Sequence, residues 1–345
     1  MTDSPPLTPE RPFRLGFLTH VNGYGRSAAR VYGEVLDTIQ AAEDLGFDGA
    51  FIAQHHFGGE RVGVPSPFVL LAAAASRTRR IHLGTAVSAL PIEEPLRFAE
   101  DAAVLDELSG GRLQLGLGTG GANRAAFGAF GVSPEQSQAR YDDALALVHD
   151  ALEGRPIRHT GLVLEPPARG LRDRLWQGTG SDEKARRVAA AGDGLFIGTF
   201  SHKPAEQQLP LIDAYRTAWR GNGPSRVGAA RAVFPGVSRP AALADLGRGL
   251  TLFRERIADH VDFAGLDDER LAARINAHYG SVDDVIGSLR ADAALLGHVD
   301  YFFPVVQHEA STVEEEIARL EIIATQIAPE LGWRSAVEPA LEEIR

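Results

Sequence analysis

Two adjacent histidines, His55 and His56, follow a buried strand predicted at residues 49–54. The stretch reads FDGAFIAQHHFGGE, so the imidazoles stand where a core strand gives way to a glycine-containing loop. An imidazole titrates near neutral pH and acts as an acid, a base or a hydrogen-bond donor. A histidine that satisfies backbone groups of the loop is the competing interpretation. We assign a catalytic role to His55 and leave His56 between the two.

The histidine spacing argues against a metal centre. Side chains alternate along a strand, so two inward-pointing ligands on one strand need a His-x-His pattern. The chain contains neither His-x-His nor His-Glu-x-x-His, and it has no cysteine. We therefore predict no metal ligands, and a metal-dependent hydrolase is only a distant alternative. The lack of cysteine also excludes disulfides, thiolate nucleophiles and iron–sulfur clusters.

A glycine-rich stretch, GLGTGG at residues 116–121, ends another predicted strand. It matches the dinucleotide pattern G-x-G-x-x-G, but it belongs to the fourth strand–helix unit and no clean helix follows it. The acidic residues that should bind a ribose, Asp142 and Asp143, fall inside a predicted helix. Glycine at a strand end also lets a flat ligand approach the backbone. This explanation and a plain flexible turn both stay open.

A second candidate, QGTGSDEKARRVAAAG at residues 177–192, has the features of a phosphate site. Ser181 is a natural N-cap, and the first turn of a helix presents unsatisfied N–H groups with a partial positive charge. Such a terminus binds anions. An ordinary strand-to-helix turn has the same appearance, and Asp182 and Glu183 would repel a phosphate.

These residues need a scaffold, and the chain alternates short apolar runs with amphipathic helical stretches. We predict eight strands, at residues 13–20, 49–54, 81–91, 112–121, 174–180, 194–200, 227–236 and 299–306. Strands without strict polar alternation, separated by helices, favour a parallel sheet covered by helices. We predict an α/β fold of the (β/α)8 TIM-barrel type, with a helical insertion at residues 239–296 before the last strand. Chemistry in such barrels lies at the C-terminal ends of the strands.

Composition sets the remaining limits. We expect a disordered leader at residues 1–12, a single barrel domain at 13–333 and a C-terminal tail at 334–345. The leader has no hydrophobic signal region, and no apolar run in the chain reaches the length of about 20 residues that crosses a bilayer. A formal net charge of −11 opposes nucleic-acid binding. The expected location is cytoplasmic.

Four segments together resemble the bacterial luciferase-like flavin monooxygenase family. They are LGFDGAFIAQHHF (45–57), the run from LGTAVSALP to LGTGG (83–121), FGAFGV (127–132) and GTGSDEKARRVAAAGDGLFIG (178–198). The resemblance implies a luciferase-like TIM barrel that binds reduced FMN at its C-terminal mouth and uses it with O2 to oxygenate a substrate. It also implies a separate flavin reductase and a homodimer.

The resemblance further implies site residues. His55 is the catalytic group, and a non-prolyl cis peptide joins Ala86 to Val87 beside the flavin. The cofactor-binding positions are Ala86, Thr119, Gly120, Gly121, Asn123, Gly180, Ser181 and Thr199. Three features depart from the luciferase pattern: Gln54 replaces a glutamate, Gly120 replaces a phosphate-binding arginine, and the reactive cysteine is missing. Arg124 or Lys184 could supply the missing charge, and light emission is not expected.

Two rival functions stay open. One is an F420-dependent oxidoreductase that transfers hydride on the same barrel, and the other is a non-catalytic flavin-binding barrel. The substrate is unidentified. Small and apolar residues expected at the mouth indicate a moderately apolar molecule; they are Ala89, Leu90, Phe127 and Phe130.

Overall fold

Eight parallel strands close into a barrel in the computed structural model, which describes residues 7–8, 11–57, 59–198, 202–256 and 265–335, with backbone only at 122–125 and 255–256. The barrel strands are β1 (Arg14–Thr19), β2 (Gly49–Ile52), β3 (His82–Thr85), β5 (Leu113–Gly118), β6 (Leu175–Gly178), β7 (Gly194–Ile197), β8 (Val227–Pro235) and β10 (Tyr301–Val305). Closure comes from β10, which pairs with both β1 and β8. All eight predicted strands are confirmed, as is the TIM-barrel class.

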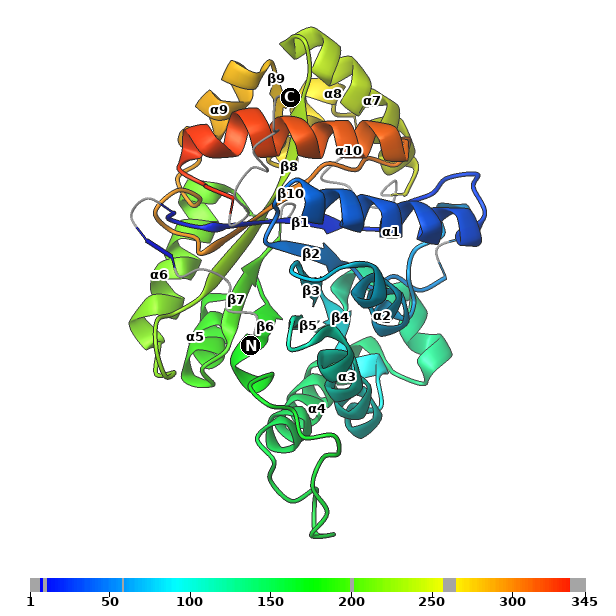
Figure 1. Ribbon diagram of the computed structural model, residues 1–345, viewed down its shortest axis with the longest axis vertical. Coiled ribbons are helices and arrows are strands. Elements are labelled where there is room, and N and C mark those ends of the chain that lie inside the picture. The colour runs from blue at the N-terminus through cyan, green and yellow to red at the C-terminus, as the bar shows by residue number, and fades with distance from the viewer. Residues whose placement is uncertain (1–6, 9–10, 58, 199–201, 257–264, 336–345) are drawn as a thin grey trace, which may run out of the picture.

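Helices surround the strands on all sides (Figure 1). They are α1 (Ala28–Asp44), α2 (Pro67–Arg77), α3 (Pro95–Ser109), α4 (Ser137–Leu152), α5 (Asp182–Ala190), α6 (Leu209–Ala218), α7 (Arg239–Arg256), α8 (Asp268–Arg274), α9 (Val282–Arg290) and α10 (Val313–Ile322). Local sequence explains where they begin. The Ser27 side chain accepts a hydrogen bond from the Arg30 N–H at the start of α1, and Thr312 with Glu315 forms a capping box on α10.

The structure differs from the sequence prediction in two places. The third predicted strand divides into β3 and the two-residue strand β4 (Ser88–Ala89), and the peptide bond between Ala86 and Val87 is cis, as expected. The predicted helical insertion also contains a short strand, β9 (His278–Gly280), which pairs with the end of β8. Three residues between α8 and α9 are too few for periodicity to reveal a strand.

The hydrophobic core has an outer layer between strands and helices and an inner layer inside the barrel. Aromatic rings fill much of the inner layer. Phe51 and Phe303 are fully buried, with ring centroids 4.5 Å apart, and the ring centroid of Phe196 lies 5.7 Å from that of Phe51. Leu18 belongs to the same cluster. The barrel interior is therefore packed, and barrels of this kind bind their ligands at the C-terminal mouth.

Both ends of the described chain meet at the opposite end of the barrel, its base. Asp48, which precedes β2, pairs with Arg11 and also accepts hydrogen bonds from the Leu15 N–H at 2.8 Å and the Trp333 indole at 3.0 Å. Arg11 lies within the segment that we assigned to a leader, and its side chain is buried.

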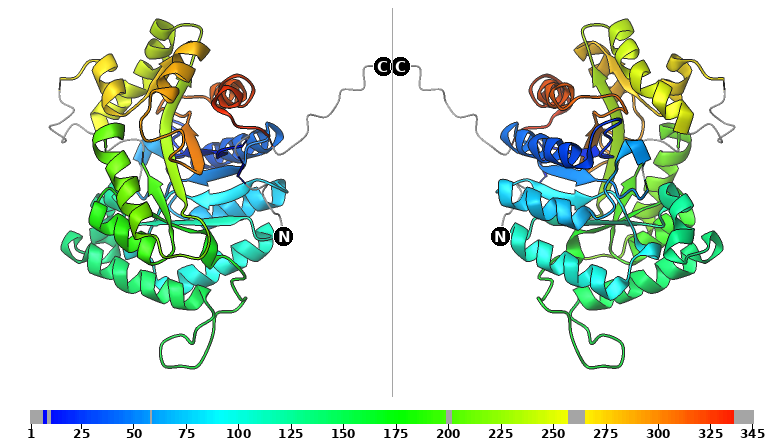
Figure 2. Two further views of the ribbon diagram at one scale, coloured as in Figure 1. Left: turned by 90° about the vertical axis from the view of Figure 1, so that its left-hand side faces the viewer. Right: turned by 90° about the vertical axis from the view of Figure 1, so that its right-hand side faces the viewer.

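The connection from α4 to β6 extends away from the barrel body (Figure 2).

Candidate functional site

Because side chains alternate along a strand, two histidines point toward the inside of the mouth. Leu18 of β1 points into the barrel, so His20, two residues later, has the same direction. Phe51 of β2 points inward, and so does His55, four residues later. Because β1 and β2 are parallel neighbours with Thr19 opposite Ile52, both imidazoles arrive at adjacent strand ends.

The two imidazoles are joined to each other. His20 Nδ1 lies 3.1 Å from His55 Nε2, and the ring centroids are 5.4 Å apart. Both side chains are half-buried. The His55 N–H donates to the Val64 carbonyl at 3.0 Å, which holds the loop after β2 in place. The sequence prediction selected His55 but assigned no role to His20, although its position at a strand end could have indicated one.

Gln54, one of the departures from the luciferase pattern, is a structural clamp. Its side-chain oxygen accepts from the Ala89 N–H at 2.6 Å, and its amide nitrogen donates to the Pro65 carbonyl at 3.0 Å and to Glu93 at 2.7 Å. An ionised glutamate here could accept the first bond but could not donate the other two. Burial raises the pKa of Glu93, which Gln54 partly opposes.

The glycines at the end of β5 are required by packing inside the protein. A Cβ on Gly118 would lie 2.5 Å from a methyl group of Val87, and one on Gly120 would lie 2.8 Å from the Ala89 Cβ. Gly120 also adopts a left-handed conformation, with φ of 73°. Neither of the two explanations in the sequence analysis, ligand approach or a flexible turn, included this close approach of the cis-peptide segment.

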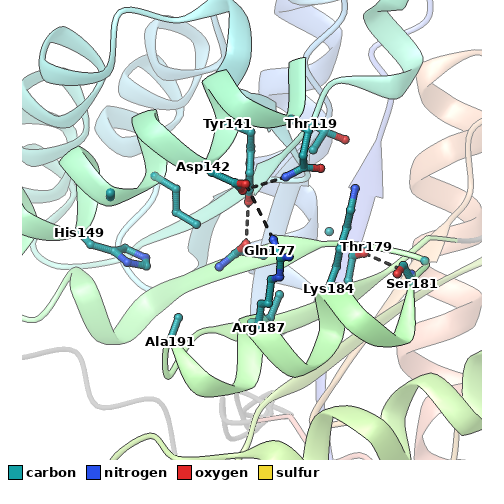
Figure 3. A pocket seen from close by; sticks show the side chains of 16 residues that line it. Thr119, Tyr141, Asp142, His149, Gln177, Thr179, Ser181, Lys184, Arg187 and Ala191 are labelled. Atoms are coloured by element: carbon teal, nitrogen blue, oxygen red, sulfur yellow. Dashed lines mark hydrogen bonds and ion pairs between the residues drawn. The ribbon is translucent and has the colours of Figure 1, made fainter. Parts of the chain in front are cut away.

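A cavity of about 530 Å³ lies between α4 and α5 at the ends of β5 and β6 (Figure 3). Three predicted cofactor-binding residues line it: Thr119, Gly180 and Ser181. Ser181 makes no side-chain cap to α5, so the helix N-terminus faces the cavity without that partner. The volume of the cavity is in the range typical of small-molecule sites.

Two cations from α5 line this cavity. Arg187 donates to Glu183 at 2.8 Å and lies 3.9 Å from Asp142, so its charge is already paired. Lys184 is half-buried, and among the described residues it has no ion-pair partner. Lys184 is therefore the cation available to an anion bound at the start of α5.

The remaining predicted residues fall into two groups. His55, Ala86, Gly120 and Gly121 lie at the mouth but do not line the α4–α5 cavity. Gly180, which lines the cavity, also packs against His202, since a Cβ on Gly180 would lie 2.2 Å from the imidazole. Thr199 lies outside the described residues, as do the side chains of Asn123 and Arg124.

The expected apolar lining of the mouth needs correction. Ala89 and Leu90 are fully buried, and Phe127 is 2% exposed, because Ala89 and Phe127 pack together in a small cluster of their own. Only Phe130, at 40%, is exposed. Its ring centroid is 4.9 Å from that of His56 and 6.0 Å from that of Phe57, so aromatic side chains form one rim of the mouth.

The described residues offer neither a metal centre nor a membrane-spanning helix. No group of three or more histidine, aspartate or glutamate side chains there could hold a metal ion. No helix within the described part of the chain is long and apolar enough to cross a membrane.

Solved structures with the same fold include monooxygenases. The monooxygenase RslO1 from Streptomyces bottropensis is 25% identical, with a TM-score of 0.79 over 92% of this chain and 99% of that one. The oxygenating constituent of 3,6-diketocamphane monooxygenase from Pseudomonas putida, determined in complex with FMN, is 19% identical, with a TM-score of 0.75 over 92% and 98%.

Sequence comparisons cover less of each relative. The uncharacterized protein y4wF from Sinorhizobium fredii is 32% identical over 59% of this chain, and an F420-dependent glucose-6-phosphate dehydrogenase from Nakamurella multipartita is 29% identical over 61%. The chain spans 60% and 62% of the lengths of these relatives. A family profile described as luciferase-like monooxygenase matches residues 13–296. The chain belongs to the luciferase-like monooxygenase family.

Proposed function

We propose that this protein is a monooxygenase that binds reduced FMN at the barrel mouth and uses it with O2 to oxygenate a small organic substrate. The observation that carries the proposal is the cavity at the start of α5, where a helix N-terminus, Ser181 and Lys184 converge beside the mouth. Those groups suit a phosphate ester. Reduced flavin, when bound, supplies the reaction with O2.

The residues of the chain have separable tasks in this proposal. Thr119, Ser181 and Lys184 bind the phosphate. The Ala86–Val87 segment, which packs closely against Gly118, forms a wall for the ring system. The aromatic inner core excludes water from below. His55 holds or delivers a proton at the mouth, with a separate reductase providing the reduced flavin.

An F420-dependent hydride transfer is the second candidate. It is supported by the relative named above, whose cofactor is also anionic and would use the same cationic cavity. Anaerobic titration of the protein with reduced FMN and with reduced F420 separates the two. We expect tighter binding of reduced FMN. Binding of reduced F420 alone would contradict the proposal.

A stopped-flow experiment then tests the reaction with O2. The complex with reduced FMN is mixed with oxygenated buffer, and the return of oxidised flavin absorbance is followed. We expect slower reoxidation than for free reduced FMN, and oxygenated product when alkanals or cyclic ketones are added as probes. A reoxidation rate equal to that of free flavin, without product, would favour the non-catalytic barrel.

We also propose a homodimer that forms through α2 and α3. These neighbouring helices carry exposed apolar side chains: Val69 is 72% exposed, Val104 is 46% and Leu108 is 65%. Exposed apolar patches mark interaction surfaces. We expect a dimer by light scattering and a monomer for Leu108→Lys. The matched change Leu162→Lys, on the connection after α4, is equally exposed at 69% and should leave the dimer intact.

A further inference from the structure

The proposed function uses His55 but leaves its partner without a role. We propose that His20 is a positioning residue that sets which nitrogen of His55 carries the proton, so that the two imidazoles act as one proton-holding unit. The geometry that carries the proposal is the contact of 3.1 Å between His20 Nδ1 and His55 Nε2. It rests on the proposed function only for the catalytic role of His55.

This contact couples the tautomers of the two rings. A neutral imidazole has one N–H and one bare nitrogen, and a hydrogen bond between two nitrogens needs one hydrogen. If His55 Nε2 donates, His55 Nδ1 is a base and His20 carries its proton on Nε2, which is not in the contact. If His20 Nδ1 donates, His55 carries its proton on Nδ1 and is a donor instead. Fixing one ring therefore fixes the other.

The contact also limits the charge that the pair holds. One added proton makes an imidazolium that donates to a neutral ring, and the hydrogen bond survives. A second added proton places hydrogens on both facing nitrogens and puts two cations on rings only 5.4 Å apart. The pair should therefore titrate in two separate steps. Charged groups on adjacent loops include Glu60, Arg61 and Glu309, and the last two form an ion pair at 3.7 Å.

Backbone hydrogen bonds hold both histidines in this arrangement. The Ala53 N–H donates to the Thr19 carbonyl at 3.0 Å, which continues the β1–β2 pairing past the end of β2. The Gly63 N–H donates to the Val21 carbonyl at 3.1 Å, and the His55 N–H donates to Val64. The segment at residues 63–64 thus ties together the loops that carry the two imidazoles.

Imidazole NMR of the protein without cofactor tests the pair. With 15N-labelled histidine, we expect one tautomer for each of His20 and His55 and two separate titration steps. In His20→Phe we expect His55 to become a mixture of tautomers with a single step. His20→Asn, which keeps a hydrogen-bonding group of smaller size, should restore one tautomer of His55. His159→Asn, an exposed histidine on the connection after α4, is the control and should change neither signal.

The outcomes separate this proposal from the proposed function. If His55 keeps its tautomer and both titration steps in folded His20→Phe, the pair is not coupled and the proposal is overturned. Thermal unfolding checks the fold, and if His20→Phe does not fold, His20→Ala makes the same comparison. Failure to bind reduced FMN would contradict the proposed function alone. With a probe that the enzyme converts to product, His20→Phe should lower kcat about 10-fold without changing the Kd of reduced FMN. His20→Asn should recover part of the lost kcat.

Discussion

The two ends of the barrel use polar residues in opposite ways. At the base, arginine side chains use nearly all of their N–H donors in hydrogen bonds within the protein. Arg112, 2% exposed, donates to four backbone carbonyls and to the hydroxyl of Thr78. Arg174 holds both carboxylate oxygens of Asp106, at 2.7 and 2.8 Å. At the mouth, imidazoles, a lysine and glycine-rich backbone replace these clamps.

Carboxyl groups show the same difference. At the base, burial alone would raise the pKa of Glu43, but the backbone N–H groups of Ile81, Arg80 and Arg79 lower it below its ordinary value. Beneath the mouth, burial raises the pKa of Glu316 to about 7, although the hydrogen bond from Gln307 and the charges of Arg319 and Arg26 oppose this. Glu43 is thus held ionised, whereas Glu316 titrates near neutrality, where a proton can be exchanged at physiological pH.

The largest expected effect is loss of a clamp at the base. Asp48→Ala leaves Arg11 buried without its carboxylate and removes the acceptor for Leu15 and Trp333. Breaking such a buried pair should lower the free energy of unfolding by about 3–5 kcal/mol, measured by urea denaturation. Asp37→Ala, which breaks an exposed pair with Arg77, should cost at most about 0.5 kcal/mol. Equal losses in the free energy of unfolding for Asp48→Ala and Asp37→Ala would contradict a special structural role of the base.

A slightly smaller effect concerns the pH dependence of stability. The Glu316 pKa is about 7 in the folded protein against 4.5 ordinarily, so the folded state keeps a proton that the unfolded chain has lost. Stability should therefore fall as pH rises from 4.5 to 7, by about 3 kcal/mol at 1.36 kcal/mol per unit. Glu316→Gln should abolish this decline in urea denaturation at pH 5 and 8. The exposed Glu321→Gln should preserve it, and a decline retained in Glu316→Gln would contradict the assignment.

The third prediction concerns chemistry at the mouth. His55→Asn should lower the rate of oxygenation of a turned-over probe by about 100-fold, as expected for loss of a general acid or base. Because the side chain is only half-buried, the free energy of unfolding should change by less than about 1 kcal/mol. His159→Asn is the matched control for activity. Loss of stability in parallel with activity would make His55 a structural residue like those of the base.

The smallest effect is expected at the cationic cavity. Lys184→Ala should weaken binding of reduced FMN about 10-fold, because it removes the cation available to the phosphate. Riboflavin, which lacks the phosphate, should bind both proteins equally in the same fluorescence titration. The matched change Arg186→Ala removes an exposed cation from α5 that does not line the cavity. Equal loss of affinity for FMN and riboflavin would show that Lys184 supports the fold of the cavity instead of contacting phosphate.

Much of the architecture is readable from local sequence, because it depends on interactions between residues close in the chain. Apolar runs identify the eight strands, and caps such as Ser27 and Thr312 mark helix starts. The rule that parallel strands expose their C-terminal ends on one side then places His55 and Ser181 at the mouth. The fold class and the approximate position of the candidate site were therefore determined by the sequence itself.

The details of the site depend on contacts between residues far apart in the chain. His20 and His55 are in contact although they are 35 positions apart in the sequence, and Gln54 accepts a hydrogen bond from Ala89 over the same sequence separation. The burial of Ala89 and the need for glycine at position 118 also follow from packing between neighbouring strand ends. Strand register and barrel closure by β10 decide these contacts, and no local pattern encodes them. Only the tertiary structure could show which polar groups at the mouth are structural and which remain available for chemistry.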